Sequence, residues 1–109
     1  MPNAEPMWIY VTAGSPEEAG AIARALVRER LVACANIIPG MRAVFWWQDD
    51  VQEADETILI VKTRADLVDR VRERVVDLHS YECPCIVALP IAAGNPPYLD
   101  WIRDQTAPA

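Results

Sequence analysis

Two adjacent strand-like stretches, residues 32–48 and 51–63, constrain the fold of this chain of 109 residues more than any other feature. The polar residues Gln48, Asp49 and Asp50 separate the two stretches and are typical of a hairpin turn. About fifteen residues of strand reach about 45–50 Å, because each residue advances about 3.3 Å. A solid globule formed by a chain of this length is only about 34 Å across. We therefore expect the end of the hairpin to project beyond its own core.

The projecting end is strongly apolar. At about 25 cal/mol per Å² of buried apolar surface, covering two Trp rings and one Phe ring contributes several kcal/mol to assembly. An exposed patch of this kind is typical of an interface between chains, so the hairpin predicts a homo-oligomer. The alternative is that the rings fold back onto the helices of their own domain. The patch comprises Val44, Phe45, Trp46, Trp47 and Val51.

The N-terminal part of the chain predicts a strand followed by a helix. Residues 7–11 are apolar and rich in strand formers. Ser15 is a suitable N-cap, Pro16 fits the first helical position, and Glu18 completes a capping box. Apolar residues then recur at helical spacing, and we expect the helix to end near residues 30–31.

The remaining elements follow the same logic. Pro39-Gly40 predicts a bulge or an edge position in the first hairpin strand, because proline cannot donate to a ladder. The apolar run 58–61 does not alternate, which indicates a strand covered on both faces. Residues 65–78 form a second amphipathic helix with Leu67, Val71, Val75 and Leu78 along its apolar stripe.

The C-terminal part predicts one more strand and a short helix. The strand covers residues 85–91, and the helix is capped by Asn95 and bears Tyr98, Trp101 and Ile102 on one side. The resulting order is β-α-β-β-α-β plus a terminal helix. This order is that of an α+β ferredoxin-like sandwich, which we expect to form a single domain over residues 1–109.

Composition excludes several classes of function. The net charge of −6 argues against nucleic acid and anionic membranes as partners, because both require clustered Lys and Arg. No apolar run approaches the ~20 residues that cross a bilayer, and the N-terminus lacks the features of a secretory signal. Three cysteines without a signal indicate reduced thiols and a cytoplasmic location. Four glycines in total exclude a phosphate-binding loop or a dinucleotide fingerprint.

One group of residues suggests metal binding. His79, Cys83 and Cys85 are close in sequence, and the two cysteines of a strand-like C-x-C point to the same side. Three such ligands suit Cu(I) or Zn(II). The alternative is structural: Cys85 buried beside the core, Cys83 at the strand entrance, and Cys34 in the core. His79 also follows a helix, whose C-terminus favours an imidazolium even without a ligand.

Five ordered motifs show that the chain, from Trp8 to Ile102, resembles the CutA divalent-cation tolerance family. The resemblance implies a trimer in which the long hairpins of three subunits associate at their edges, with an overall shape similar to the PII signalling proteins. It implies tolerance of copper and other divalent metals, and it implies no established catalytic activity. The motifs are ACANIIPG (33–40), FWWQ (45–48), Glu56 followed by IVKT (60–63), HSYECP (79–84) and YLDWI (98–102).

The resemblance also implies a second set of functional residues, which would meet in a cleft between subunits. A mixture of acid, cation, imidazole and phenol with an aromatic side chain suits a small anionic or zwitterionic ligand, or acid–base chemistry. The alternative is a set of hydrogen bonds and ion pairs between subunits. This set is Trp47, Glu56, Lys62, His79, Tyr81 and Glu82.

The chain departs from the family pattern at five positions. Asp49 occupies the hairpin turn where relatives have Gly, Ser80 replaces the Pro that follows the His, and Cys85 replaces a Glu. Val11 and Leu78 stand where some bacterial relatives have a Cys and a second His. A copper site built on those two extra ligands therefore does not transfer to this protein.

The sequence is compatible with three functional hypotheses. The first is a homotrimeric copper or divalent-cation tolerance protein that binds a metal ion or small ligand near the cleft between subunits, without turnover. The second is a PII-like signalling module that binds a small effector and a protein partner. The third is an enzyme acting on a small molecule.

Overall fold

The protein is described by a computed structural model covering residues 3–106, so the first two and last three residues of the expected domain lie outside the described part. The observed order confirms the predicted ferredoxin-like arrangement with its C-terminal helix. Strand and helix bounds differ from the predicted ones by a few residues at most. The elements are β1 Pro6–Ala13, α1 Pro16–Arg28, β2 Cys34–Trp47, β3 Asp50–Arg64, a 3₁₀ turn Ala65–Leu67, α2 Val68–Leu78, β4 Ile86–Pro90 and α3 Pro96–Gln105.

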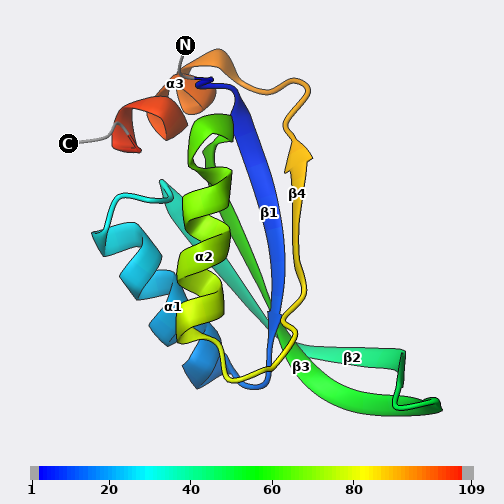
Figure 1. The fold of residues 1–109 in the computed structure, drawn as a ribbon. Coiled ribbons are helices and arrows are strands. Elements are labelled where there is room, and N and C mark those ends of the chain that lie inside the picture. Colours follow the sequence, from blue (N-terminus) through cyan, green and yellow to red (C-terminus); the bar gives the residue numbers. More distant parts are fainter. Residues whose placement is uncertain (1–2, 107–109) are drawn as a thin grey trace.

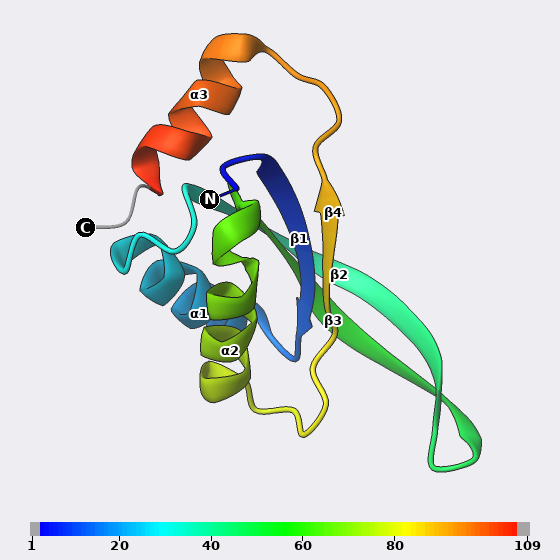
Figure 2. The ribbon, with the colours of Figure 1, turned by 45° about the horizontal axis from the view of Figure 1, so that its top comes forward.

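The four strands form one antiparallel sheet in the order β2-β3-β1-β4. Helices α1 and α2 cover the same face of this sheet, as Figures 1 and 2 show. Helix α3 lies near the end of the sheet that is remote from the hairpin turn (Figure 1). Among residues 3–106, no layer of helices covers the other face of the sheet (Figures 1 and 2).

The core fills the space between the sheet and the two long helices. Alternate residues of β3 contribute to it, and Leu59 and Val61 are fully buried. Their neighbours Ile58 and Ile60 point to the uncovered face and are only half-buried. The expectation that residues 58–61 are covered on both faces is therefore wrong for a single chain. The other fully buried core residues include Ile9, Val11, Ile22, Leu26, Val71 and Val75.

The start of α1 confirms half of the predicted capping box. The amide of Glu18 donates to Oγ of Ser15 at 3.1 Å, which satisfies one of the free donors at the helix N-terminus. The carboxylate of Glu18 does not return to Ser15. It accepts instead from the amide of Gly14 at 3.1 Å and from that of Ser80 at 2.8 Å, so it joins α1 to the loop after α2.

The predicted ends of two helices also need correction. Helix α1 ends at Arg28 rather than near residues 30–31, because Arg30 adopts a left-handed conformation with φ of 59°. At the start of α3, Asn95 makes no capping bond through its side chain. Its backbone carbonyl accepts from the amides of Tyr98 and Leu99.

The hairpin contains the predicted bulge and a tight turn. The β2–β3 register shifts between Ile38 and Met41, and Gly40 adopts a φ of 81° that glycine tolerates without a steric penalty. Gln48 and Asp49 have φ values of 52° and 62°, as in a type I′ turn. Asp49 therefore adopts a left-handed conformation, which glycine tolerates best.

The hairpin projects from the domain, as the size argument predicts. The molecule extends 44 Å along its longest axis and 26 and 24 Å along the others, and Figure 2 shows the hairpin extending away from the helices. Trp46 is 73% exposed, and Val44 is 63% exposed. The alternative in which the aromatic rings fold back onto their own helices is therefore wrong.

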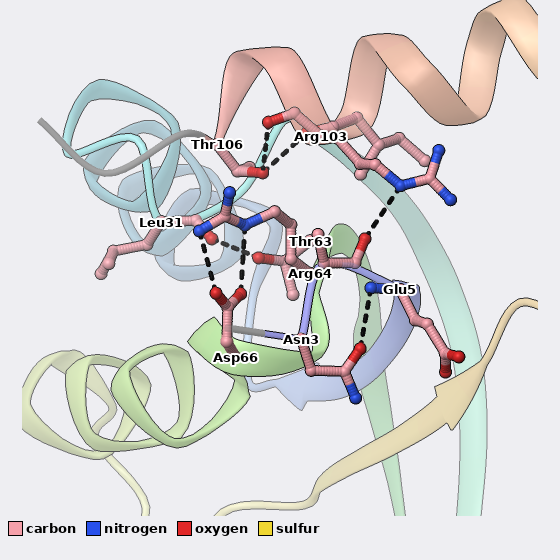
Figure 3. Close-up of polar contacts among 10 residues, drawn as sticks. Asn3, Glu5, Leu31, Thr63, Arg64, Asp66, Arg103 and Thr106 are labelled. Carbon is pink, nitrogen blue, oxygen red and sulfur yellow. Dashed lines mark hydrogen bonds and ion pairs between the residues drawn. The ribbon is translucent and has the colours of Figure 1, made fainter. Parts of the chain in front are cut away.

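A network of polar contacts surrounds residues 3–5 at the end of the sheet near α3 (Figure 3). Arg64 forms two 3.1 Å hydrogen bonds with the carboxylate of Asp66, and its side chain is only 10% exposed. Nε of Arg103 donates to the carbonyl of Ala4 at 3.0 Å. The amide of Ala65 donates to the carbonyl of Glu5. These contacts hold Ala4 against α3 and Glu5 against the 3₁₀ turn that precedes α2.

Candidate functional site

An open groove of about 800 Å³ lies between the hairpin and the loop that joins α2 to β4. Apolar side chains of the hairpin, including Phe45 and Trp47, line one part of it. Residues 81–83 and Cys85 line another part. A groove of this volume suits a small ligand. Four of the six residues implied by the family resemblance line it, namely Trp47, Glu56, Tyr81 and Glu82.

Tyr81 and Glu56 are in direct contact. The phenol hydroxyl donates to Oε1 of Glu56 at 2.8 Å. Burial and this contact with a carboxylate raise the pKa of Tyr81 to about 12, because both disfavour the phenolate. Tyr81 is therefore a neutral hydrogen-bond donor at physiological pH.

His79 is buried behind the groove rather than in it. Its Nε2 lies 2.7 Å from the carbonyl oxygen of Thr12, which accepts only, so Nε2 bears the hydrogen. Its Nδ1 accepts from the amide of Tyr81 at 3.0 Å. Both ring nitrogens are thus engaged in the pattern of a neutral imidazole. The expected imidazolium at the C-terminus of α2 does not match these partners, and neither nitrogen offers a free lone pair to a metal.

Glu18 holds the same loop from the other side. Its Oε2 accepts from the amide of Ser80 and lies 4.0 Å from Nδ1 of His79. Partial burial raises the pKa of Glu18, but the hydrogen bonds from Ser80 and Gly14 outweigh it, so the net shift is downward. His79 and Glu18 therefore position the loop, whose far side faces the groove.

Cys83 and Cys85 line the groove as free thiols. The structural alternative placed Cys85 beside the core, but this residue is exposed. Partial burial of the sulfur and the negative charge of Glu56 raise the pKa of Cys85. Within residues 3–106, no three His, Cys, Asp or Glu side chains form a preassembled metal site.

Lys62 lies at the other end of the sheet. It is six residues beyond Glu56 on β3, a separation of about 20 Å along the strand. Its Nζ donates to Oδ1 of Asn36 at 3.0 Å and to Sγ of Cys34 at 3.8 Å. Cys34 is half-buried on the uncovered face of the sheet, so the expectation that it belongs to the core is wrong. Within one chain, Lys62 does not meet Tyr81 or Glu82.

The groove of a single chain is acidic. The described residues that line it include Glu53, Glu56 and Glu82, and none of them is Lys, Arg or His. Arg42 neutralises part of this charge through ion pairs with Glu53 at 3.4 Å and Asp55 at 3.0 Å. Because Lys62 and His79 are outside the groove, its remaining charge suits a cation better than an anion.

The comparison with protein families settles the classification. The model of the CutA1 divalent ion tolerance protein family matches residues 7–105. The chain belongs to this family. The CutA1 match covers nearly the whole chain, and it confirms the resemblance indicated by the five motifs.

Relatives agree with this assignment in sequence and in structure. The CutA protein of Thermus thermophilus is 50% identical over 98 residues, which cover 90% of this chain and 95% of the relative. The CutA protein of Archaeoglobus fulgidus is 46% identical over 91% of this chain and 95% of its own length. The crystal structure of CutA1 from Oryza sativa has a TM-score of 0.93 at 38% identity and covers 98% of both chains.

The compartments named for CutA relatives vary. The Archaeoglobus fulgidus structure is described as periplasmic, and the Oryza sativa relative is described as chloroplastic. The chain spans about half the length of the chloroplastic relative, at 55%. Between residues 3 and 106, no helix has the length and apolar character needed to cross a membrane.

Proposed function

We propose that this chain functions as a homotrimeric divalent-cation tolerance protein that binds copper, or another divalent cation, in the hairpin groove at a cleft between subunits. The groove carries the proposal, because it combines carboxylates and two exposed thiols without a basic side chain. A cytoplasmic location fits these free thiols, because thiols stay reduced there.

The uncovered apolar surfaces support the oligomer. Val44, Trp46 and Val51 on the hairpin are each at least half exposed. On the open face of the sheet, Val87 and Leu89 of β4 are also about half exposed. Two apolar surfaces of this kind on one small domain are typical of a chain that is covered by copies of itself.

The thiols and carboxylates of the groove favour a cation as the bound species. Thiolate ligands favour Cu(I) and Zn(II), and the carboxylate of Glu82 is exposed beside them. His79 positions the loop through Thr12 and Tyr81 and is not assigned as a ligand. Since one chain has no complete site within the described residues, the proposal requires a ligand from a neighbouring subunit or a rearrangement of residues 79–85. Lys62 would approach the groove only from such a neighbour.

A Cu(I) titration of the purified oligomer tests the proposal. Competition with a chromophoric Cu(I) chelator, without oxygen, compares the native chain with the double variant Cys83→Ser/Cys85→Ser. We expect the double variant to bind Cu(I) more than about tenfold more weakly. Cys34→Ser is the matched control, because Cys34 lies outside the groove, and it should bind as the native chain does. Equal affinity of the double variant and the native chain would contradict the assignment.

A further inference from the structure

The single histidine of the chain lies at the start of the loop that joins α2 to β4, and its side chain is 0% exposed. This loop, the end of β1 and the start of α1 meet at the imidazole (Figure 1). Nδ1 of His79 accepts from the amide of Tyr81 at 3.0 Å, and Nε2 donates to the carbonyl of Thr12 at 2.7 Å. A side chain of the type whose charge changes near neutral pH therefore lies behind the groove wall.

A carboxylate is placed to receive a proton from this imidazole. Oε2 of Glu18 lies 4.0 Å from Nδ1 of His79 and accepts from the amide of Ser80 at 2.8 Å. Burial raises the pKa of Glu18, but the hydrogen bonds from Ser80 and Gly14 outweigh it, so the carboxylate is ionised. Because a carboxylate oxygen accepts more than one hydrogen bond, Oε2 can bind a hydrogen on Nδ1 and keep that of Ser80.

Glu18 supplies the only carboxylate within 4.0 Å of the imidazole among residues 3–106. Strand β1 presents the uncharged carbonyl of Thr12, and the Tyr81 ring lies 4.6 Å from the imidazole, centroid to centroid. On β3, Glu56 is linked to this region through its 2.8 Å bond with the Tyr81 hydroxyl. On α2, Asp77 is exposed. A positive charge on the imidazole would thus be directed at Glu18.

We infer that protonation of His79 at Nδ1 switches the loop between two conformations. A protonated Nδ1 is a donor, so it no longer accepts from the amide of Tyr81. An approach of about 1 Å brings Nδ1 within hydrogen-bond distance of Oε2 of Glu18. The bonds from Nε2 to Thr12 and from Ser80 to Glu18 are kept, so the loop changes from Tyr81 onward.

The switch changes the wall of the groove. Tyr81 packs against the imidazole and donates to Glu56, and both residues line the groove. When the amide of Tyr81 is released, the phenol loses its fixed position and its bond to Glu56 weakens. The groove of the acidic form therefore presents a freer carboxylate and a less ordered wall. Because the switch acts from behind the groove, it does not depend on which ligand the groove binds.

An NMR titration of the ¹⁵N-labelled full-length oligomer, from about pH 8 to about pH 5, tests the inference over the interval in which histidines change charge. We expect the signal of Nδ1 to change from that of an acceptor nitrogen to that of a protonated one. The amide signal of Tyr81 should follow with the same midpoint, whereas the amide of Ser80 should stay protected from hydrogen exchange. Since the chain has one histidine, the imidazole signals belong to one residue.

Two variants separate the roles of the acid and the imidazole. In His79→Asn the side-chain oxygen can accept from the amide of Tyr81 but does not titrate, so the Tyr81 signal should lose at least about nine-tenths of its change. Glu18→Gln removes the charge that receives the proton and should move the transition to lower pH by about 0.5–1 unit. Glu73→Gln, on the exposed side of α2, is the control and should leave the transition unchanged.

Three results would overturn the inference. The first is an imidazole that stays neutral down to about pH 5 in the folded native chain. The second is protonation of the native imidazole without a change at the amide of Tyr81. The third is an unchanged transition in a folded Glu18→Gln protein. If His79→Asn fails to fold, the native titration and Glu18→Gln decide between these outcomes.

Discussion

The hydroxyl of Tyr81 donates a 2.8 Å hydrogen bond to Oε1 of Glu56, and this contact joins the loop after α2 to the middle of β3. Glu56 is one of the three carboxylates that line the groove. The bond thus holds Tyr81 and Glu56 together in the groove wall. The phenol hydrogen also compensates part of the negative charge of Glu56. A cation that binds to Glu56 must compete with the phenol or share the carboxylate with it.

Removal of the Tyr81 hydroxyl separates the contribution of this bond to stability from its effect on cation binding. We expect Tyr81→Phe to lower the free energy of unfolding by about 1 kcal/mol, since the hydrogen bond is lost but the ring stays. Glu56 becomes free in this variant, so the affinity for a divalent cation should rise or stay constant. Urea unfolding and a cation titration of both proteins measure the two quantities. A higher free energy of unfolding for Tyr81→Phe than for the native chain would contradict a stabilising role of this hydrogen bond.

The same contact predicts a pH dependence at the alkaline end. The pKa of Tyr81 is raised from 10.0 to about 12 in the folded state. The folded state therefore holds the phenolic proton more tightly than the unfolded state does. The resulting stabilisation is complete below about pH 10 and is lost as pH rises to about 12. The stability difference between the native chain and Tyr81→Phe should shrink across this window, and a constant difference would contradict the assignment.

His79 should prove structural rather than a metal ligand. We expect His79→Ala to lose about 2–4 kcal/mol of stability, because it leaves a cavity and deprives the Thr12 carbonyl and the Tyr81 amide of their partner. Leu78→Ala, at an exposed neighbouring position, is the control and should lose less than about 1 kcal/mol. A folded His79→Ala protein with native Cu(I) affinity would confirm the structural role. Selective loss of Cu(I) binding in a stable variant would refute it.

The ion pair in Figure 3 should contribute to stability, whereas a surface pair should not. Arg64 is 10% exposed and forms two hydrogen bonds with Asp66, so Arg64→Met should cost about 1–3 kcal/mol. Arg72 lies 3.8 Å from Asp69, with side chains 51% and 87% exposed, and Arg72→Met should change stability by less than about 0.5 kcal/mol. Thermal unfolding compares the two variants. Equal shifts in Tm would contradict this ranking.

The hairpin turn offers a stabilising substitution. Asp49 has a φ of 62°, a conformation that glycine adopts without steric cost. Asp49→Gly should therefore stabilise the hairpin by up to about 1 kcal/mol. Gln52→Gly, in the regular part of β3, is the control and should destabilise the chain, because glycine weakens a strand interior. Destabilisation by Asp49→Gly would show that the aspartate side chain makes a compensating contribution.

Local sequence signals predicted most of the fold. Ser15 and Pro16 located the start of α1, and Pro39-Gly40 located the bulge, because capping and backbone strain depend on neighbouring residues alone. The length of the hairpin predicted that it projects from the domain, because the rise per residue of a strand is fixed. The uncovered sheet face was not foreseen, since an apolar run such as residues 58–61 indicates burial without saying which chain provides the cover.

The site was predicted less well, because its geometry depends on contacts between remote residues. Glu56 and Tyr81 were expected to meet in a cleft between subunits, whereas the contact in the structure lies within one chain. Lys62 was grouped with them although strand length separates it from Glu56 by about 20 Å. The bonds of His79 to Thr12 and Tyr81 could not be inferred from spacing. The proximity of Cys34 to Tyr98 likewise arises only when α3 packs beside the start of β2.

The molar mass of the purified protein in solution tests the central claim most directly. Light scattering coupled to size exclusion at micromolar concentration should give three times the chain mass of 12.2 kDa. Trp46→Asp, at the exposed hairpin end, should lower this mass, whereas Val76→Asp, at an exposed position of α2, should leave it unchanged. A native chain that elutes with a mass of 12.2 kDa would contradict the account, because the groove would then have no neighbouring subunit.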